Sequence, residues 1–246
     1  MSSYSCNPIP VILKLFLSGL NIKYFGDYKK KQQAINCESV FKKNQKKLSL
    51  TQEQQGAIKT IKKSNKGFNV VVLDGVTSSG KTRVYMHAIK DTIINGLQCV
   101  ILVPEKILTK QWIKEISKDF DLSPEIFHSS IPQKKRNEIW FDVLNKQSQL
   151  IIGTRSALFL PFQNLGLIVI DEEHDASFKQ DEGTIINVRD LGIVRAKYSN
   201  SQIILSSATP SIETIFNCEK KKYLKISLKK RVKKSLLPRI KTIDLK

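Results

Sequence analysis

Short apolar runs recur along the chain from residue 50 onward, and segments of helical length separate them. The runs are rich in β-branched residues and do not alternate with polar ones, which is typical of strands buried on both faces of a parallel sheet. They lie at Val70–Leu73, Val100–Val103, Leu150–Ile152, Leu167–Ile170 and Ile203–Leu205. Helices are predicted at Val84–Ile94, Thr109–Phe120, Pro132–Lys146 and Val188–Lys197. This alternation predicts a doubly wound, mostly parallel α/β sheet with ligands at the carboxyl ends of its strands.

Residues 1–46 follow a different pattern. The apolar stretch Val11–Leu17 predicts one helix, and the lysine runs at Tyr28–Lys31 and Lys42–Lys47 are more typical of a solvated linker than of a binding arm. We therefore expect a short N-terminal appendage over 1–46 and one domain over 47–246. A helix that starts at Thr51, a good N-cap, opens that domain.

The composition narrows the class of protein. The 41 basic and 22 acidic residues give a net charge of +19, which favours a polyanionic partner such as nucleic acid. An AT-rich genome would enrich lysine as well, so charge alone leaves both explanations open. Because no run reaches the roughly 20 apolar residues of a membrane span and no basic leader is visible, we expect a cytoplasmic protein with no membrane partner. The four cysteines form no C-x-x-C pair, which argues against zinc and against a disulfide framework.

One strand-to-helix junction carries a phosphate-binding pattern. The octapeptide Gly75-Val76-Thr77-Ser78-Ser79-Gly80-Lys81-Thr82 follows the run that ends at Leu73, and this is the G-x-x-x-x-G-K-[ST] pattern in its required setting. Glycines let such a loop curl around phosphates, while free amides and the helix dipole favour negative charge. Lys81 would reach the β- and γ-phosphates, and Thr82 would ligate Mg²⁺. The sequence therefore predicts a nucleoside triphosphate site.

Two later strand ends complete this prediction. Asp171 and Glu172 follow the run at Leu167–Ile170, where Asp171 suits a Mg²⁺ ligand and Glu172 a general base. Ser207 to Pro210 follow the next run and would place small hydroxyls beside the γ-phosphate. There they could link hydrolysis to a change in shape.

The set of motifs resembles the first RecA-like lobe of the superfamily 2 helicases. The blocks between them resemble more specifically the PriA-type replication-restart helicases, over roughly residues 50–217. These blocks are Leu102–Glu105, Leu108–Thr109, His128–Ser129, Gly153–Pro161, Asn164–Asp175, Phe178–Gln180 and Arg189–Asp190.

The resemblance implies a role for each matching residue. ATP would be the nucleotide, with the Gln54 side chain on the adenine edge. Single-stranded DNA would lie against Pro104, Glu105, Gly153, Thr154 and Arg155, through backbone amides and one guanidinium. Coupling between the two sites would use His174, Ser207, Thr209 and Arg189, together with a DNA-sensing loop over Phe178–Arg189. The implied activity is 3′ to 5′ DNA unwinding driven by ATP, on single-stranded or forked DNA, with primosome and single-strand-binding proteins as partners.

Some positions depart from the family pattern. Ser78 stands where glycine is usual, Arg83 where glutamate is usual, and Lys106 where an apolar residue is usual; residues 184–188 lack the expected basic and aromatic side chains. The chain also ends before a second lobe and a zinc module, so we expect a fragment that binds Mg·ATP and hydrolyses it slowly. Two alternatives stay open: a non-catalytic module that grips DNA or a partner, and another P-loop DNA translocase subunit, against which the block Gly153–Pro161 argues.

Overall fold

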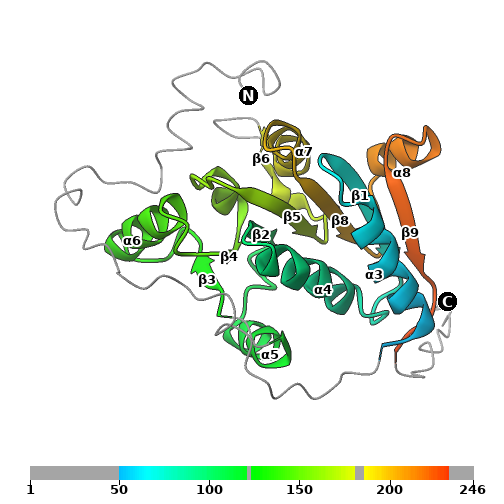
Figure 1. Cartoon of the computed structure of the whole chain (residues 1–246), viewed down its shortest axis with the longest axis horizontal. Coiled ribbons are helices and arrows are strands. Elements are labelled where there is room, and N and C mark those ends of the chain that lie inside the picture. The colour runs from blue at the N-terminus through cyan, green and yellow to red at the C-terminus, as the bar shows by residue number, and fades with distance from the viewer. Residues whose placement is uncertain (1–49, 121–122, 181–185, 233–246) are drawn as a thin grey trace, which may run out of the picture.

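The computed structural model describes residues 50–120, 123–180 and 186–232. Its centre is a sheet of seven strands in the order β3-β4-β2-β5-β8-β1-β9, and every pairing in it is parallel (Figure 1). In chain order these strands are β1 (Asn69–Gly75), β2 (Gln98–Leu102), β3 (Glu125–Phe127), β4 (Leu150–Gly153), β5 (Leu165–Asp171), β8 (Gln202–Ser207) and β9 (Leu224–Leu228). The predicted doubly wound α/β class is confirmed.

Helices connect these strands along the described residues. They are α3 (Gln52–Ser64), α4 (Lys81–Ile94), α5 (Lys110–Phe120), α6 (Gln133–Leu144), α7 (Val188–Tyr198) and α8 (Ile212–Glu219). Two short 3₁₀ turns, η2 (Arg155–Phe159) and η3 (Ala176–Phe178), follow β4 and β5. A separate antiparallel pair, β6 (Lys179–Gln180) and β7 (Ile186–Asn187), precedes α7.

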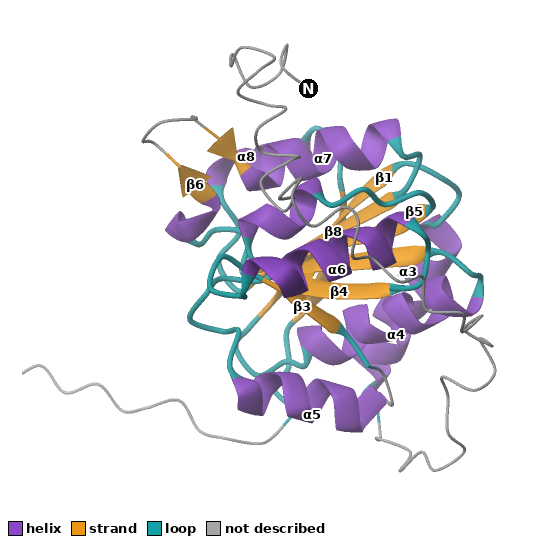
Figure 2. Ribbon diagram, turned by 90° about the vertical axis from the view of Figure 1, so that its left-hand side faces the viewer, coloured by secondary structure: helices purple, strands orange, loops and turns teal. Residues whose placement is uncertain are grey.

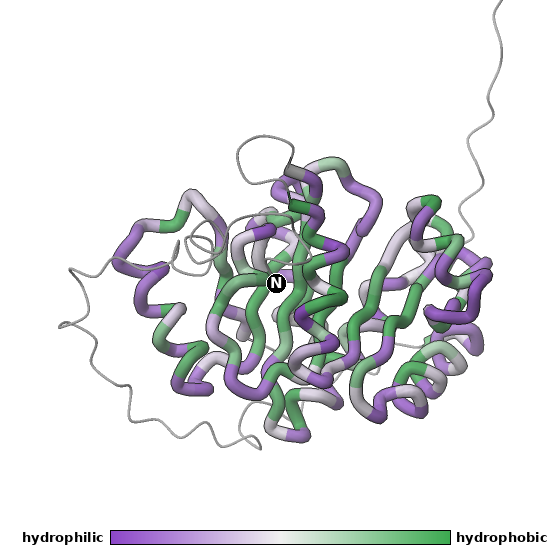
Figure 3. Tube along the Cα trace, turned by 90° about the horizontal axis from the view of Figure 1, so that it is seen from above, coloured by the Kyte–Doolittle hydropathy of each residue, from purple (hydrophilic) through white to green (hydrophobic). Residues whose placement is uncertain are grey.

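The sheet separates two apolar cores. Because successive side chains of a strand point to opposite faces, Val70 and Val72 of β1 join the core under α6 and α7, while Val71 and Leu73 join the core under α3, α4 and α5. Figure 2 shows the strands between α4 and α5 on one side and α7 on the other. The tube in Figure 3 is most hydrophobic along the central strands. The uninterrupted apolar runs of the sequence follow from this burial on both faces.

The predicted helices and strands begin and end within a few residues of the observed ones. Thr51 caps α3 through a capping box: its hydroxyl accepts a hydrogen bond from Gln54 N, and the Gln54 side chain accepts one from Thr51 N. The five predicted strands correspond to β1, β2, β4, β5 and β8, and the four predicted helices to α4, α5, α6 and α7.

The sequence pattern did not predict β3, β9 or α8. Strand β9 reads Leu-Lys-Ile-Ser-Leu and is mostly exposed at the edge of the sheet, so it lacks the continuous apolar run of a central strand. Strand β3 is three residues long. The appendage expected over 1–46 lies outside the described residues. Within the part of the chain that the structure describes, no helix is long and apolar enough to cross a bilayer.

Candidate active site

The predicted motifs meet at one edge of the sheet, where the parallel strands end. Strand β8 lies between β1 and β5, with Asp74 beside Ser207 and Asp171 beside Ser206. The phosphate-loop sequence, the hydroxyl block and the carboxylates therefore follow three adjacent strands. On the other side of β5, β2 and β4 are paired through Leu102 and Gly153, so the predicted DNA-contacting blocks also end on neighbouring strands.

The phosphate loop is closed by its own lysine. The Lys81 side chain is buried, and its Nζ donates a hydrogen bond of 2.7 Å to Gly75 O. The loop turns through two left-handed residues, Ser78 at φ 65° and Gly80 at φ 83°. Ser78 therefore adopts the positive φ for which glycine would be the usual residue.

The donors of this loop fit an anion. Gly80 caps α4 without a side-chain hydrogen bond. Among the described residues, no backbone carbonyl accepts a hydrogen bond from the amides of Gly80, Lys81 or Thr82. The Ser79 hydroxyl is buried and has no partner either. Free amides at a helix N-terminus, beside a lysine ammonium, are the donor set that phosphates require. Val76 and Thr77 of the same loop are exposed.

Gln54 supports the loop from α3. Its side chain is fully buried, and Nε2 donates to Ser79 O at 2.8 Å while Oε1 accepts from Thr51 N. A Cβ at Gly80 would lie 2.3 Å from Gln54 Nε2, so this position also requires glycine for lack of space. The structure thus gives Gln54 a contact with the loop that the sequence did not predict, and its contact with adenine stays a prediction.

The strand β9 also supports the loop, again unpredicted. Val76 N donates to Leu228 O at 3.2 Å, and beyond the strand Val232 N donates to Ser78 O at 3.0 Å. The segment that follows β9 is tied in turn to α3, because Lys229 N and Lys230 N both donate to Glu53 Oε2.

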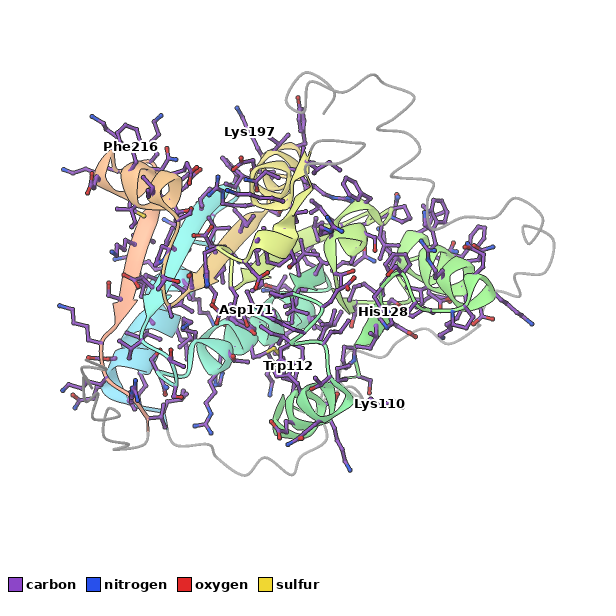
Figure 4. All side chains as sticks on the ribbon, turned by 180° about the vertical axis from the view of Figure 1, so that it is seen from behind. Lys110, Trp112, His128, Asp171, Lys197 and Phe216 are labelled. Carbon is purple, nitrogen blue, oxygen red and sulfur yellow. The ribbon has the colours of Figure 1, made fainter. Side chains whose placement is uncertain are left out.

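Asp171, at the end of β5, is buried and accepts three hydrogen bonds. Ser206 Oγ donates to Oδ1 at 2.7 Å, Glu172 N donates to the same oxygen at 3.2 Å, and Tyr85 OH donates to Oδ2 at 2.9 Å. Figure 4 labels Asp171 near the centre of the molecule. Glu172 follows at φ 51° and is partly exposed, which leaves its carboxylate accessible at the edge.

Three of the four predicted coupling residues meet directly. His174 Nδ1 and Ser207 Oγ are 2.7 Å apart in a hydrogen bond, and Ser207 Oγ accepts a second hydrogen bond from Thr209 N. His174 Nδ1 is also 3.6 Å from Glu172 Oε2. The carboxylate strand and the hydroxyl block are thereby joined by side chains, and the coupling role of these residues stays a prediction.

Arg189, the fourth, is joined to this group only indirectly. It donates to Ser211 Oγ at 2.5 Å, and Ser211 N donates to Glu173 Oε1 at 2.7 Å. Although burial opposes its charge, hydrogen bonding to Asp190 and the carboxylates of Glu173 and Glu213 raise the pKa of Arg189. Residues 181–185 of the predicted sensing loop lie outside the described residues.

The predicted DNA-contacting blocks are joined by their main chains. Val103 N donates to Gly153 O at 2.9 Å, and Thr154 N donates to Phe127 O at 3.2 Å. Pro104 and Thr154 are buried, whereas Glu105 is exposed and Arg155 is partly exposed at the start of η2. Their contact with DNA stays a prediction.

A buried arginine holds the second of these blocks in place. Arg195 of α7 donates to Leu158 O and, at 2.6 Å, to Leu160 O, and its guanidinium lies 5.3 Å from the centre of the Phe162 ring. Burial lowers the pKa of Arg195 to about 10, which leaves it charged at neutral pH. No motif in the sequence indicated this residue, because its partners lie 35 to 37 positions earlier in the chain.

One ion pair connects the two groups of motifs. Lys106, two residues after Pro104, contacts Asp175, three residues after Glu172. The hydrogen bond from Lys106, followed by that from Ser177 N, lowers the pKa of Asp175 to about 2. The unusual lysine that the sequence showed at this position therefore has a partner in the carboxylate loop.

Comparison with known proteins agrees with this arrangement. Residues 51–217 match the model of the DEAD/DEAH box helicases. The chain belongs to this family. The replication restart protein PriA of Rickettsia prowazekii is 42% identical over 245 residues, which cover 100% of this chain and 36% of that protein. The PriA of Bacillus subtilis is 35% identical over 85% of this chain and 26% of its own length.

The similarity to the Rickettsia protein includes residues 1–49, so it extends beyond the 50–217 expected from the motifs. The chain spans about a third of the length of that relative. Among solved structures, RecG bound to a three-way DNA junction matches 87% of this chain with a TM-score of 0.55 at 22% identity, and the helicase MrfA bound to DNA matches 74% with a TM-score of 0.51 at 17% identity. These structures share its fold. The family generally uses ATP and Mg²⁺.

Proposed function

We propose that this chain is the ATP-binding lobe of a DNA helicase that acts in replication restart, with 3′ to 5′ DNA-dependent ATP hydrolysis as the activity of the whole protein. The relatives named replication restart protein PriA support this function. Single-stranded or forked DNA is the proposed substrate, and primosome and single-strand-binding proteins are the proposed partners.

One observation carries the nucleotide site: the phosphate loop and the carboxylate pair lie at the same edge of the sheet, separated only by β8. Ser206 on β8 donates to Asp171 on β5, and Tyr85 on the helix after the loop donates to the same carboxylate. A nucleoside triphosphate held by the loop would therefore lie near the buried carboxylate of Asp171, which is hydrogen-bonded to the helix that follows the loop.

Each residue of the nucleotide site has a proposed role. The amides of Gly80, Lys81 and Thr82 would hold the phosphates, and the Lys81 ammonium would offset their charge. Thr82 and Asp171 would hold Mg²⁺, a cation that favours a few oxygen ligands and retains water. When bound, Mg²⁺ would neutralise charge on the phosphates. Glu172, accessible at the edge, would accept a proton from the attacking water.

The neighbouring strand ends would hold DNA. Main-chain groups after β2 and β4 and the Arg155 guanidinium would meet the phosphates of a single strand. Because such contacts involve the backbone of the nucleic acid, we expect binding that depends little on base sequence and that weakens as salt increases.

Nucleotide binding tests this proposal directly. We expect a fluorescent ATP analogue to bind the chain in the presence of Mg²⁺, and Lys81→Ala to weaken it by about 10- to 100-fold, since hydrogen bonds to charged groups contribute about 1.5–3 kcal/mol. Lys197→Ala is the matched control, because Lys197 is exposed on α7 and Figure 4 shows it away from Asp171. Nucleotide affinity that is equal in Lys81→Ala and in the unchanged chain would instead favour a non-catalytic binding module.

A further inference from the structure

A buried tyrosine connects the phosphate-loop helix to the carboxylate strand. Tyr85 lies on α4 one turn after Lys81, and no part of its side chain is exposed. Its hydroxyl donates a hydrogen bond of 2.9 Å to Asp171 Oδ2, across 86 positions of sequence. Tyr85 therefore bonds one of the two residues that are proposed to hold Mg²⁺, and it lies three positions after the other, Thr82, on the same helix.

The donors around Asp171 leave little of its carboxylate free. Each carboxylate oxygen has two acceptor sites. Ser206 Oγ and Glu172 N occupy both sites of Oδ1, while Tyr85 occupies one site of Oδ2. As far as the described residues show, one acceptor site, on Oδ2, is left for a further ligand, and the Tyr85 hydroxyl sets the orientation of that oxygen.

The phenol is suited to act as a donor to Asp171. A phenol has one O–H group to donate, and that of Tyr85 is directed at Asp171 Oδ2 from a ring that is fully buried.

We propose that Tyr85 is a positioning residue for Mg²⁺ binding: its hydroxyl orients Asp171 so that the remaining acceptor site of Oδ2 serves the metal ion or its bound water. The inference rests on the proposed nucleotide site. Partners of metal ligands commonly change metal affinity by 10- to 100-fold when they are removed, although they never touch the metal.

The alternative is a purely structural role, in which Asp171 only accepts the hydrogen bond that the buried Tyr85 hydroxyl needs. The two roles predict different effects of Tyr85→Phe, which keeps the ring and removes only the hydroxyl. A structural role would lower nucleotide affinity equally with and without metal. A positioning role would lower only the part of the affinity that Mg²⁺ supplies.

The test titrates Mg²⁺ against a fixed amount of the fluorescent ATP analogue, and measures the affinity for the same analogue in EDTA. We expect Tyr85→Phe to raise the Mg²⁺ midpoint by about tenfold and to leave the affinity in EDTA unchanged. Tyr198→Phe is the matched control, because Tyr198 is 69% exposed on α7 and should alter neither quantity. An unchanged Mg²⁺ midpoint, or an equal loss in EDTA, overturns the proposal.

A double-mutant cycle separates action through Asp171 from any other effect. In an Asp171→Asn background, Tyr85→Phe should no longer shift the Mg²⁺ midpoint; a shift of the same size there overturns the proposal. If the unchanged chain shows no Mg²⁺-dependent binding, the proposed function fails together with this inference. If it binds and Tyr85→Phe has no effect, only the inference fails.

A spectroscopic measurement covers the case in which Tyr85→Phe does not fold. The chain is labelled with 3-fluorotyrosine, and the ¹⁹F signal of position 85 is assigned by replacing each of the other tyrosines with phenylalanine. The signal should shift when Mg²⁺ is added to the nucleotide complex and stay in place when EDTA is added instead. A signal that is identical in both conditions overturns the proposal.

Discussion

The two halves of the sheet's carboxyl edge are built from different kinds of hydrogen bond. Beside β1, β8 and β5, side chains of separate strands bond one another, as in the Ser206–Asp171 and His174–Ser207 pairs. Beside β2, β4 and β3, main-chain groups make the connections, as from Val103 N to Gly153 O. The first of these, which is proposed to bind nucleotide and is called the nucleotide half, adds a network of ionisable and hydroxyl side chains to its main-chain bonds. In the other, called the outer half, main-chain bonds join the strand ends.

This difference suits the ligands proposed for the two halves. A side-chain network changes its charges and partners when phosphates and a metal ion arrive, so it can report their presence. A backbone scaffold presents fixed amides to a polymer whose phosphates repeat at regular spacing. Lys106 and Asp175 bridge the two halves by an ion pair.

Adding a methyl group at Gly153, in the outer half, should change the free energy of unfolding more than any other substitution considered below. A Cβ at Gly153 would lie 2.2 Å from Phe127 O and 2.6 Å from the Ala157 Cβ, so Gly153→Ala should lower the free energy of unfolding by about 3 kcal/mol. Gly56→Ala is the control, because a Cβ at this exposed position of α3 would meet nothing within 4 Å. It should stabilise the chain by about 0.5–1 kcal/mol. Urea unfolding measures both, and equal values for the two variants would contradict the close packing seen at β3 and β4.

Removing the buried guanidinium of Arg195 should have the second-largest effect on the free energy of unfolding. Arg195→Met removes the guanidinium donor from Leu158 O and leaves Leu160 O with the bond from Phe162 N, so it should cost about 2 kcal/mol, again by urea unfolding. Below the unfolding temperature, the affinity for single-stranded DNA should fall and that for Mg·nucleotide should not. Arg195→Lys keeps the charge but cannot reach both carbonyls, so it should resemble the methionine variant. Equal losses of both affinities would mean that the two halves are not separate.

The sequence was most informative where the chain is buried on both faces. The five central strands could be predicted because both of their faces are buried, so each appears in the sequence as a continuous apolar run such as Leu167–Ile170. Strand β9 could not, since its Lys225 faces water and pairs with Asp74. The phosphate loop and the carboxylates could be placed at one edge because parallel strands all end there.

The supporting residues of the site were harder to predict. Tyr85 gave a weak signal, since its spacing from Lys81 places it on the same helix face one turn later. Gln54 was assigned to adenine, yet its bond to Ser79 O depends on the packing of α3 against the loop. Arg195 gave no signal, because nothing in a mid-helix arginine indicates which distant carbonyls it will reach. Long-range partners of this kind are fixed by tertiary packing rather than by local pattern.

Replacing Ser78, a residue of the nucleotide half with a strained backbone, should change the free energy of unfolding by a smaller amount. Ser78 has a φ of 65°, which costs a residue with a Cβ about 1 kcal/mol relative to glycine. Ser78→Gly should therefore raise the free energy of unfolding by up to about 1 kcal/mol and leave nucleotide affinity unchanged. Asn200→Gly, at φ 48°, tests the same backbone effect away from the loop, although it also removes the bond from Phe68 N. A destabilised Ser78→Gly chain would show that the serine side chain, rather than the backbone, decides this position.

The smallest effect should come from the ion pair that bridges the two halves. Lys106 is 73% exposed, so water screens the pair, and Asp175→Asn should cost only about 0.5 kcal/mol at pH 6. The asparagine keeps the acceptor for Ser177 N, which isolates the charge. Because the pKa of Asp175 is lowered to about 2 from its usual 3.8, the contribution should be complete above about pH 4 and disappear as pH falls through about 2.

The measurement is the difference in urea unfolding free energy between the unchanged chain and Asp175→Asn at several pH values. Other carboxylates titrate in both proteins, so their effects cancel in the difference. Lys106→Met should give the same pH profile, since it removes the other partner of the pair. A difference that persists unchanged at pH 2 would mean that the loss in Asp175→Asn does not come from the charge of Asp175, and the two halves of the edge would then lack an electrostatic connection at this point.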